Sequence, residues 1–148
     1  MEKFNIIIVD DNGLLLKEFK KSIEFSSIAR VHTAQSLQEF QVYMSRYNID
    51  LIITDSQVRD LNTQKFIKMK EYLSENNLKE KYIIFLNYDA RCSEEEKEQN
   101  DIFFDEVFVR PFRMGELKEK ISKYFPKRYP QKTVIIRRKR GRGYMPKI

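Results

Sequence analysis

The sequence is poor in the residues that build disulfides and transition-metal centres. It contains one cysteine, Cys92, and one histidine, His32, among 148 residues. A single cysteine excludes an internal disulfide and a Cys-rich zinc site, and it fits a reducing cytoplasm. No other ligand stands at metal-binding spacing from His32, so we expect it to be a half-exposed loop residue after the second strand and assign it no role.

Long apolar runs are also missing. No stretch approaches the roughly 20 residues that a helix needs to cross a bilayer. Met1-Glu2-Lys3-Phe4 leads directly into a strand pattern, with no signal peptide before it. We therefore expect a soluble, cytoplasmic protein. The sequence also has no internal repeat.

Acidic residues are absent from the last part of the chain. Residues 127–148 carry nine Lys or Arg and no Asp or Glu, whereas residues 1–126 carry 19 Lys or Arg and 22 Asp or Glu. The net charge of +6 therefore divides into −3 for the first part and +9 for the second. With 41% hydrophobic residues, the chain fits one domain, residues 1–126, followed by a basic tail, residues 127–148.

Apolar segments alternate with helical patterns through most of the chain. Strands are predicted at residues 4–9, 28–33, 50–55, 81–86 and 106–109. Apolar residues at helical spacing predict helices around Leu15, Phe19 and Ile23, around Leu37, Phe40 and Met44, around Phe66, Met69 and Leu73, and around Met114, Leu117, Ile121 and Phe125. Asn12 can cap the first of these helices. The alternation predicts a doubly wound α/β fold with a parallel sheet and helices on both faces.

One further helix is predicted less firmly by its pattern. Ser93 and Glu96 form a capping box, but Glu94 to Asn100 has almost no apolar face. We expect this helix to be short or loosely held.

Three aspartates stand at the ends of two predicted strands. Residues 4–9 lead into Asp10 and Asp11, and residues 51–54 lead into Asp55. If these strands are parallel neighbours, their carboxyl ends place the three carboxylates in one crevice. Two like charges about 4 Å apart repel by roughly 4 kcal/mol at an effective dielectric of about 20, so the cluster needs a cation. Oxygen ligands of this kind suit Mg²⁺.

Polar residues stand at the ends of four of the predicted strands. They are the pair Asp10-Asp11 after the first strand, Asp55 after the third, Asn87 after the fourth and Arg110-Pro111 after the fifth. This set resembles the response-regulator receiver family, which has an Asp pair, an Asp, a small polar residue and a cation-Pro dipeptide at these places. The resemblance covers residues 4–125. It implies a flavodoxin-like sheet of five parallel strands in the order 2-1-3-4-5, and a phosphorylatable switch protein rather than an enzyme.

The same resemblance implies a role for each acidic residue of the crevice. Asp55 would take a phosphoryl group from a histidine kinase as an acyl phosphate. Asp11, Asp55 and the main-chain carbonyl of Gln57 would contact Mg²⁺, and Asp10 would act through water. Phosphoryl transfer asks mainly for neutralised charge and in-line positioning, which explains these residue types.

Several residues depart from the family pattern. Asn87 stands where the family usually has Thr or Ser, and Arg110 stands where it usually has Lys. Together with Tyr88, these side chains would contact the phosphoryl group, but their length and shape differ from those of the usual residues. Arg59 and Thr63 replace the Pro and Gly that usually shape the loop after the phosphoacceptor. We therefore expect that loop to follow a different path.

The basic tail contains the run Arg137-Arg138-Lys139-Arg140-Gly141-Arg142-Gly143-Tyr144. Its Arg-Gly-Arg core resembles AT-hook peptides, which lie in the minor groove of A·T-rich DNA, although the flanking prolines are absent. The run also resembles part of the wing of winged-helix response regulators. We expect Arg137, Arg138, Lys139, Arg140 and Arg142 to bind DNA. If about six cations met phosphates, log affinity would fall against log salt with a slope of about −5.

Other functions compete with that of a phosphorylated, DNA-binding regulator. The tail could solubilise the protein, or pair as a strand at residues 134–136 with a partner's sheet. The domain could be a pseudo-receiver that acts as a nucleic-acid or protein interaction module without phosphorylation. A metal-dependent phosphohydrolase ranks last, because no His or Lys stands out as a general acid. A homodimer is considered as well, since a single-arm binder gains much from pairing.

Overall fold

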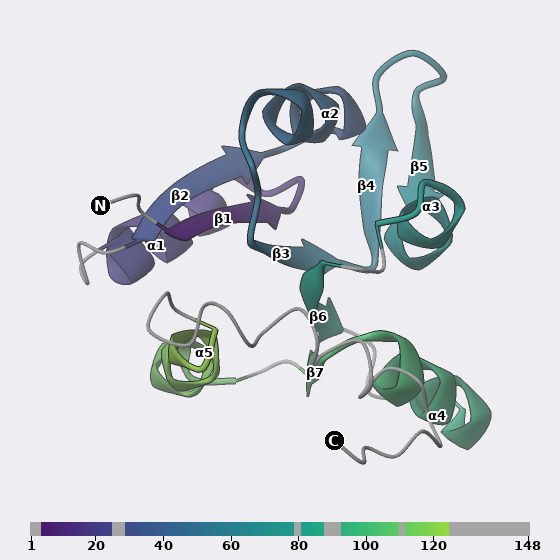
Figure 1. Ribbon diagram of the computed structural model, residues 1–148. Helices are drawn as coiled ribbons and strands as arrows, with labels where there is room; N and C mark the ends of the chain where they lie inside the picture. Colours follow the sequence, from purple (N-terminus) through teal and green to yellow (C-terminus); the bar gives the residue numbers. More distant parts are fainter. Residues whose placement is uncertain (1–3, 25–28, 79–80, 88–92, 110–111, 125–148) are drawn as a thin grey trace.

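The main sheet has five parallel strands. The computed structural model describes residues 4–24, 29–78, 81–87, 93–109 and 112–124. Within them the strands of this sheet are β1 (Phe4–Val9), β2 (Ala29–Ala34), β3 (Leu51–Asp55), β6 (Tyr82–Asn87) and β7 (Glu106–Val109). They lie in the order β2-β1-β3-β6-β7, and every neighbouring pair is parallel (Figure 1). The predicted sheet and its strand order are confirmed.

Helices cover both faces of this sheet. The described residues form α1 (Gly13–Glu24), α2 (Leu37–Arg46), α3 (Met69–Glu75), α4 (Glu94–Phe103) and α5 (Met114–Ser122). α1 and α5 pack on one face, and α2 and α3 pack on the other (Figure 1). None of the described helices has the length and apolar content to cross a bilayer.

Side chains of the strands alternate between two cores. In β1, Ile6 and Ile8 pack beneath α1 and α5, whereas Ile7 and Val9 pack beneath α2 and α3. Successive side chains of a strand point to opposite faces, so a sheet covered on both sides needs apolar residues at every position. This is why the central strands read as continuous apolar runs in the sequence.

The predicted helix caps at Asn12 and Ser93 are confirmed. The side-chain oxygen of Asn12 accepts hydrogen bonds from the N–H groups of Leu14 (3.1 Å) and Leu15 (3.2 Å) at the start of α1. At the start of α4, the Ser93 hydroxyl accepts from the N–H of Glu96 at 3.1 Å. Such bonds satisfy donors that have no partner within the helix.

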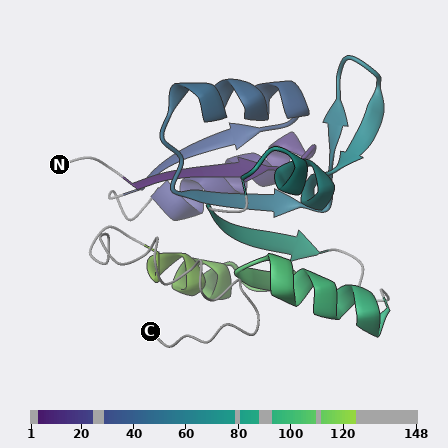
Figure 2. The same ribbon diagram turned by 45° about the vertical axis from the view of Figure 1, so that its right-hand side comes forward.

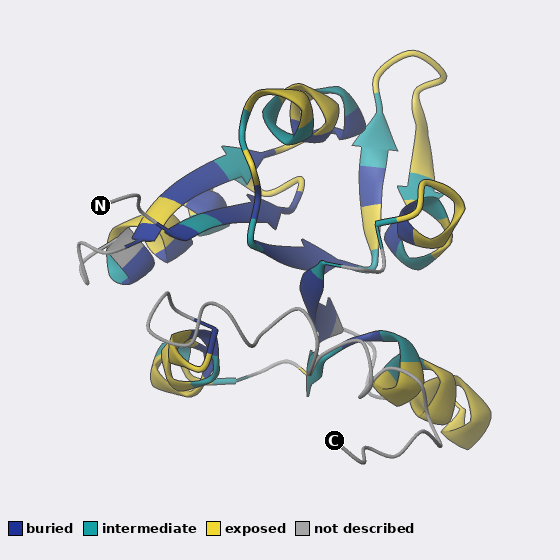
Figure 3. Cartoon of the chain, in the orientation of Figure 1, coloured by how far each residue is buried: buried dark blue, intermediate teal, exposed yellow. Residues whose placement is uncertain are grey.

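α4 differs from the other helices in its contacts. It has ten residues, as many as α2, so it is not short. None of its side chains is buried, however, and most of its surface is exposed (Figure 3). The expectation of a loosely held helix therefore agrees with the burial, and the expectation of a short one does not.

The segment after β3 is a hairpin rather than the start of a helix. β4 (Gln57–Asp60) pairs antiparallel with β5 (Lys65–Lys68), and the hairpin projects beyond the main sheet (Figure 2). The prediction that Phe66 belongs to the third helix is wrong, because Phe66 lies in β5 and α3 begins at Met69. The expectation that this segment departs from the path usual in the receiver family stays a prediction.

The hairpin forms because its residues alternate between the core and the outside. Val58 is fully buried and Ile67 packs against the same core, so one face of the hairpin adds to the interior. Arg59 and Phe66 lie opposite each other in the neighbouring pair, and the Arg59 guanidinium carbon is 4.6 Å from the centroid of the Phe66 ring. This cation–π contact covers a ring that remains 46% exposed.

Gln38 of α2 ties the hairpin to the body of the protein. Its side-chain amide donates to Asp60 Oδ1 at 2.7 Å, and its amide oxygen accepts from the N–H of Leu61 at 2.9 Å. The hydrogen bond from Gln38 is the main cause that lowers the pKa of Asp60. An isolated parallel bridge between Ser36 and Arg59 adds a backbone connection at the same place.

His32 lies inside β2, within the strand predicted at residues 28–33, so the expectation of a half-exposed loop position after that strand is wrong. It is in β2 and only 7% exposed. Its ring stacks on Tyr47 with centroids 4.2 Å apart, and its Nε2 is 3.2 Å from Asn5 Oδ1. Aromatic packing from α2, which the sequence pattern of β2 alone does not reveal, explains this burial.

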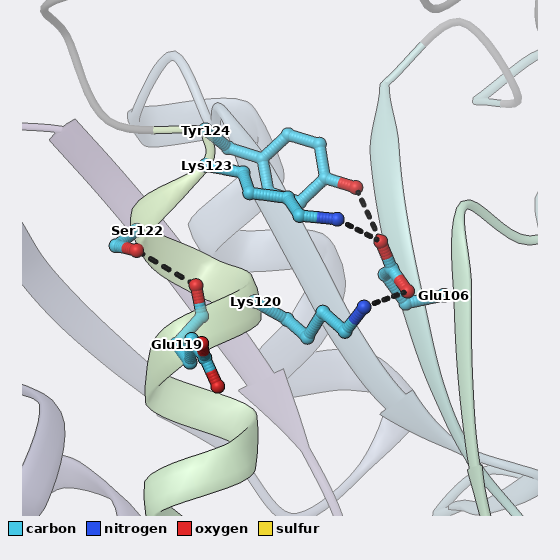
Figure 4. A network of polar contacts seen from close by, with 6 residues as sticks. All are labelled: Glu106, Glu119, Lys120, Ser122, Lys123 and Tyr124. Carbon is cyan, nitrogen blue, oxygen red and sulfur yellow. Dashed lines mark hydrogen bonds and ion pairs between the residues drawn. The ribbon is translucent and has the colours of Figure 1, made fainter.

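Glu106 joins the end of α5 to the start of β7. Its carboxylate accepts a hydrogen bond from the Tyr124 hydroxyl at 3.3 Å and forms ion pairs with Lys123 at 3.3 Å and Lys120 at 3.6 Å (Figure 4). Burial raises the pKa of Tyr124 well above its ordinary value of 10.0, and the negative charges of Asp105 and Glu106 add to the effect. The described part of the chain ends at this anchored tyrosine.

The stability of the fold should therefore fall when the Tyr124 phenol is forced to ionise. Because its pKa is raised in the folded protein, its contribution is complete below about pH 10 and is lost as the pH rises further, by up to about 1.4 kcal/mol per pH unit. Chemical denaturation of Tyr124→Phe and wild type at about pH 9 and pH 11 measures the difference. Wild type should lose more free energy of unfolding; equal losses would show that another group titrates.

Candidate functional site

Asp10 and Asp55 lie side by side at the carboxyl edge of the sheet. β1 and β3 are parallel neighbours, and their last registered pair is Val9 with Thr54. One residue further along each strand come Asp10 and Asp55. Adjacent strands are about 4.8 Å apart. Asp10 is fully buried and Asp55 is 5% exposed, so two carboxylates share a poorly hydrated place.

The backbone of the adjoining turns holds both carboxylates. Asp10 Oδ1 accepts from the N–H of Asn12 at 3.0 Å, and the N–H of Asp10 itself donates to the carbonyl of Ala34 at 3.0 Å. Asp55 Oδ1 accepts from the N–H of Ser56 at 2.6 Å. Each acid is thus fixed in orientation by its own loop, as a ligand or nucleophile must be.

The third aspartate of the predicted cluster is placed differently. Asp11 is exposed, whereas Asp10 and Asp55 are buried. In the described part of the chain, no group of three or more His, Cys, Asp or Glu side chains is arranged to hold a metal ion. The structure thus brings two of the three acids together, and the magnesium site stays a prediction.

Gln57 stands at the start of the hairpin, two residues after Asp55. The N–H of Met69 donates to the carbonyl of Ser56 at 2.9 Å, which closes the base of the hairpin. Opposite residues of an antiparallel ladder form hydrogen-bonded and non-hydrogen-bonded pairs in alternation. Ser56 and Met69 form a hydrogen-bonded pair, so the next pair, Gln57 and Lys68, is not hydrogen-bonded. The Gln57 carbonyl therefore points away from β5 and is not used by the hairpin ladder.

The other predicted site residues are only partly covered by the structure. The backbone of Asn87 ends β6, one position beyond the pair formed by Asp55 and Leu86, so it reaches the same edge of the sheet. The Asn87 side chain, Tyr88 and Arg110 lie outside the described residues. So do the tail residues Arg137, Arg138, Lys139, Arg140 and Arg142. Their roles, and the division of the chain at residue 126, stay predictions.

Sequence reasoning missed three interactions that organise this edge. Asn12 and Ser56 supply the N–H groups that hold the two carboxylates, and Gln38 fixes the hairpin that follows. Backbone donors leave no trace in the sequence, so the first two had no signal. The sequence did contain a signal for the hairpin, because Val58 stands between polar neighbours, an alternation that is typical of strands.

Comparison with known proteins identifies the fold of the chain but no family by sequence. No family model matches the sequence, and no curated protein matches it. Solved structures match over most of the chain: the Francisella response regulator 1452 receiver domain has a TM-score of 0.68 at 16% identity and covers 85% of this chain and 99% of that one. The chain has a receiver-domain fold.

Two further structures show the same receiver fold. The CheY-like response regulator receiver domain protein from Methanospirillum hungatei JF-1 has a TM-score of 0.67 at 21% identity, covering 82% of this chain and 93% of that one. The signal receiver domain of a DNA-binding response regulator protein (merR) from Colwellia psychrerythraea 34H has a TM-score of 0.66 at 12% identity, covering 82% and 97%. The strand order and the layers of helices agree with this receiver fold.

Proposed function

We propose that the chain is a two-component response regulator in which a histidine kinase phosphorylates Asp55. The observation that carries this proposal is the pair of buried carboxylates, Asp10 and Asp55, at the carboxyl edge of a receiver fold. Two adjacent buried carboxylates are costly unless a cation neutralises them. A bound divalent cation would also offset the charge of an incoming phosphoryl group, which is the main demand of phosphoryl transfer.

The proposed chemistry uses the residues of this edge in distinct roles. An oxygen of Asp55 attacks the phosphorus of a phosphohistidine, the phosphorus–nitrogen bond breaks, and the imidazole leaves with its electron pair. Mg²⁺ would be held by Asp11, Asp55 and the carbonyl of Gln57, with Asp10 acting through water. The direction of the Gln57 carbonyl, away from β5, supports its share. Asn87, Tyr88 and Arg110 would contact the phosphoryl oxygens.

The basic tail supplies the output in this proposal. Nine Lys or Arg and no acidic residue in residues 127–148 give the charge that binding to the phosphate backbone of DNA requires. Arg137, Arg138, Lys139, Arg140 and Arg142 would make these contacts, with Arg-Gly-Arg suited to a narrow A·T-rich minor groove. One structural neighbour is the receiver domain of a DNA-binding response regulator, which is consistent with such an output.

Intact-mass spectrometry after incubation with a small phosphodonor and Mg²⁺ tests the phosphorylation. Wild type should gain one phosphoryl group, and Asp55→Asn should gain none. Asp50→Asn is the matched control, because Asp50 precedes the same strand at its amino end and accepts from the N–H of Asn5. It should be modified like wild type. An unmodified wild type, under conditions that modify a known receiver domain, would contradict the proposal.

A pseudo-receiver is the second candidate, and the placement of Asp11 favours it. With Asp11 exposed and the loop after Asp55 rebuilt as a hairpin, the fold could serve as an interaction module without phosphorylation. In that case Asp55→Asn should bind nucleic acid as wild type does, with or without phosphodonor. A change of affinity on phosphorylation of wild type alone would exclude this candidate.

A further inference from the structure

α4 presents a surface that nothing in the described part of the protein covers. Its side toward the sheet carries the half-buried Asn100 and Phe103. The opposite side is exposed along its whole length (Figure 3). Glu94, Glu98 and Asp101 stand at positions i, i+4 and i+7, so they line one side of the helix.

The exposed side of α4 combines negative charge with apolar residues. The helix contains five acidic residues and one cation, Lys97, which gives a net charge of −4. Ile102, four residues after Glu98, is 42% exposed, and Val109 of the nearby β7 is 41% exposed. A partner that fits this surface therefore has to be cationic and to carry some apolar side chains.

The tail of the same chain has this composition. Residues 127–148 carry a charge of +9, and the apolar run Val134-Ile135-Ile136 directly precedes the run of cations from Arg137 to Arg142. Because the two charged segments belong to one chain, their association is intramolecular and their effective concentration is high.

Tyr124, the last residue described before the tail, contacts β7, the strand that follows α4, while α4 itself packs on the opposite face of the sheet from α5. The last described residue, Tyr124, is hydrogen-bonded to Glu106, which follows the last residue of α4, Phe103, by three positions (Figure 4). α4 is about 15 Å long, and the 18 residues from 125 to 142 can span about 60 Å when extended. The cationic run can therefore reach every acidic residue of the helix.

We infer that residues 127–148 dock on the exposed side of α4 and that this contact competes with nucleic acid for the cations of the tail. The inference rests on the nucleic-acid-binding role proposed above and adds an internal competitor to it. Docking lowers the apparent affinity for nucleic acid in proportion to the fraction of tails that are free. Both contacts weaken as salt rises, since the pairs are exposed.

Hydrogen exchange of the full-length protein tests the docking itself. The probe variant replaces Arg137, Arg138, Lys139, Arg140 and Arg142 by Gln, and it leaves the described domain unchanged. At low salt, amides of α4 should exchange about fivefold faster in this variant than in wild type, while amides of α1 keep their rates. High salt should abolish the difference. Equal rates for α4 in both proteins at low salt would overturn the inference.

Binding to an A·T-rich duplex oligonucleotide tests the competition. The variant Glu94→Gln, Glu98→Gln, Asp101→Asn should bind about fivefold more tightly than wild type at low salt. The control Glu18→Gln, Glu71→Gln, Glu75→Gln removes three exposed acids from α1 and α3, with the same change of net charge. It should gain clearly less. Equal gains would show that net charge alone acts, which would overturn the competition.

The two measurements separate this inference from the proposed function. If α4 is protected by the tail but no variant binds nucleic acid, the docking stands and the nucleic-acid role fails. If wild type and both acid-to-amide variants bind nucleic acid equally, the tail variant binds more weakly, and α4 exchanges alike in all, the nucleic-acid role stands and the docking fails.

Discussion

Adding Mg²⁺ to the wild-type protein should raise its melting temperature by about 5–10 °C, when the ion is present at about 100 times its dissociation constant. The reason is that Asp10 and Asp55 are both buried at adjacent strand ends. A cation that binds between them stabilises the folded state and has little affinity for the unfolded chain, where these residues are 45 positions apart. Thermal denaturation with Mg²⁺ and with a chelator measures the shift.

Variants of the two buried acids should lose most of this shift. Asp55→Asn and Asp10→Asn keep a side-chain oxygen for the N–H groups of Ser56 and Asn12 but remove one negative charge from the site. Asp101→Asn, on the exposed side of α4, serves as the control and should respond to Mg²⁺ like wild type. A shift of equal size in all four proteins would place the ion elsewhere and would remove the main support for the phosphorylation chemistry.

The second large effect concerns Phe40, which anchors α2 to the sheet. Phe40 is fully buried, and its ring meets that of Tyr72 from α3 edge to face, with centroids 6.1 Å apart. Phe40→Ala removes this contact and leaves a cavity in the core beneath α2 and α3. The free energy of unfolding should fall by about 3–5 kcal/mol, as measured by chemical denaturation.

Phe66→Ala provides the matched control for Phe40→Ala. The same side chain is removed, but from the outer face of the hairpin, where the Phe66 ring is 46% exposed and contacts Arg59. The expected loss is about 0.5–1 kcal/mol, the worth of an exposed cation–π contact. A loss for Phe66→Ala as large as that for Phe40→Ala would mean that the hairpin is part of the cooperative core.

The strands and their order could be predicted because the sheet is covered on both faces. A short continuous apolar run such as Ile6-Ile7-Ile8-Val9 is typical of a strand that is buried on both faces. The helices predicted between such strands indicate that neighbouring strands are parallel. The positions of Asp10 and Asp55 followed from the same reasoning. The exposure of Asp11 required coordinates, because two residues past the end of β1 the direction of a side chain depends on the turn.

The hairpin could not be predicted with the same means. Phe66, Met69 and Leu73 stand at helical spacing, and this pattern continues correctly into α3. What decided the structure of Phe66 is tertiary: Val58 and Ile67 fill the core, and Gln38 of α2 binds Asp60 and Leu61. Contacts between segments about 20 residues apart outweigh local propensity in short elements.

His32 was misplaced for a related reason. As the lone histidine near the end of a predicted strand, it suggested a surface position. In the structure, Tyr47 stacks on its ring and Asn5 contacts its Nε2, so aromatic and polar neighbours from two other elements replace water. An amphipathic ring of this kind is buried whenever such neighbours exist, and a single sequence does not disclose them.

The hairpin that follows Asp55 is joined to the acid at one end and held by α2 at the other. Only Ser56 separates the acid from β4, and the bond from Met69 to Ser56 keeps the two strands together at that point. Each strand of four residues is about 13 Å long. Because Gln38 bonds Asp60 and Leu61 at the far end, a displacement at Asp55 would be passed along the ribbon to α2, at the other end of the hairpin from the acid.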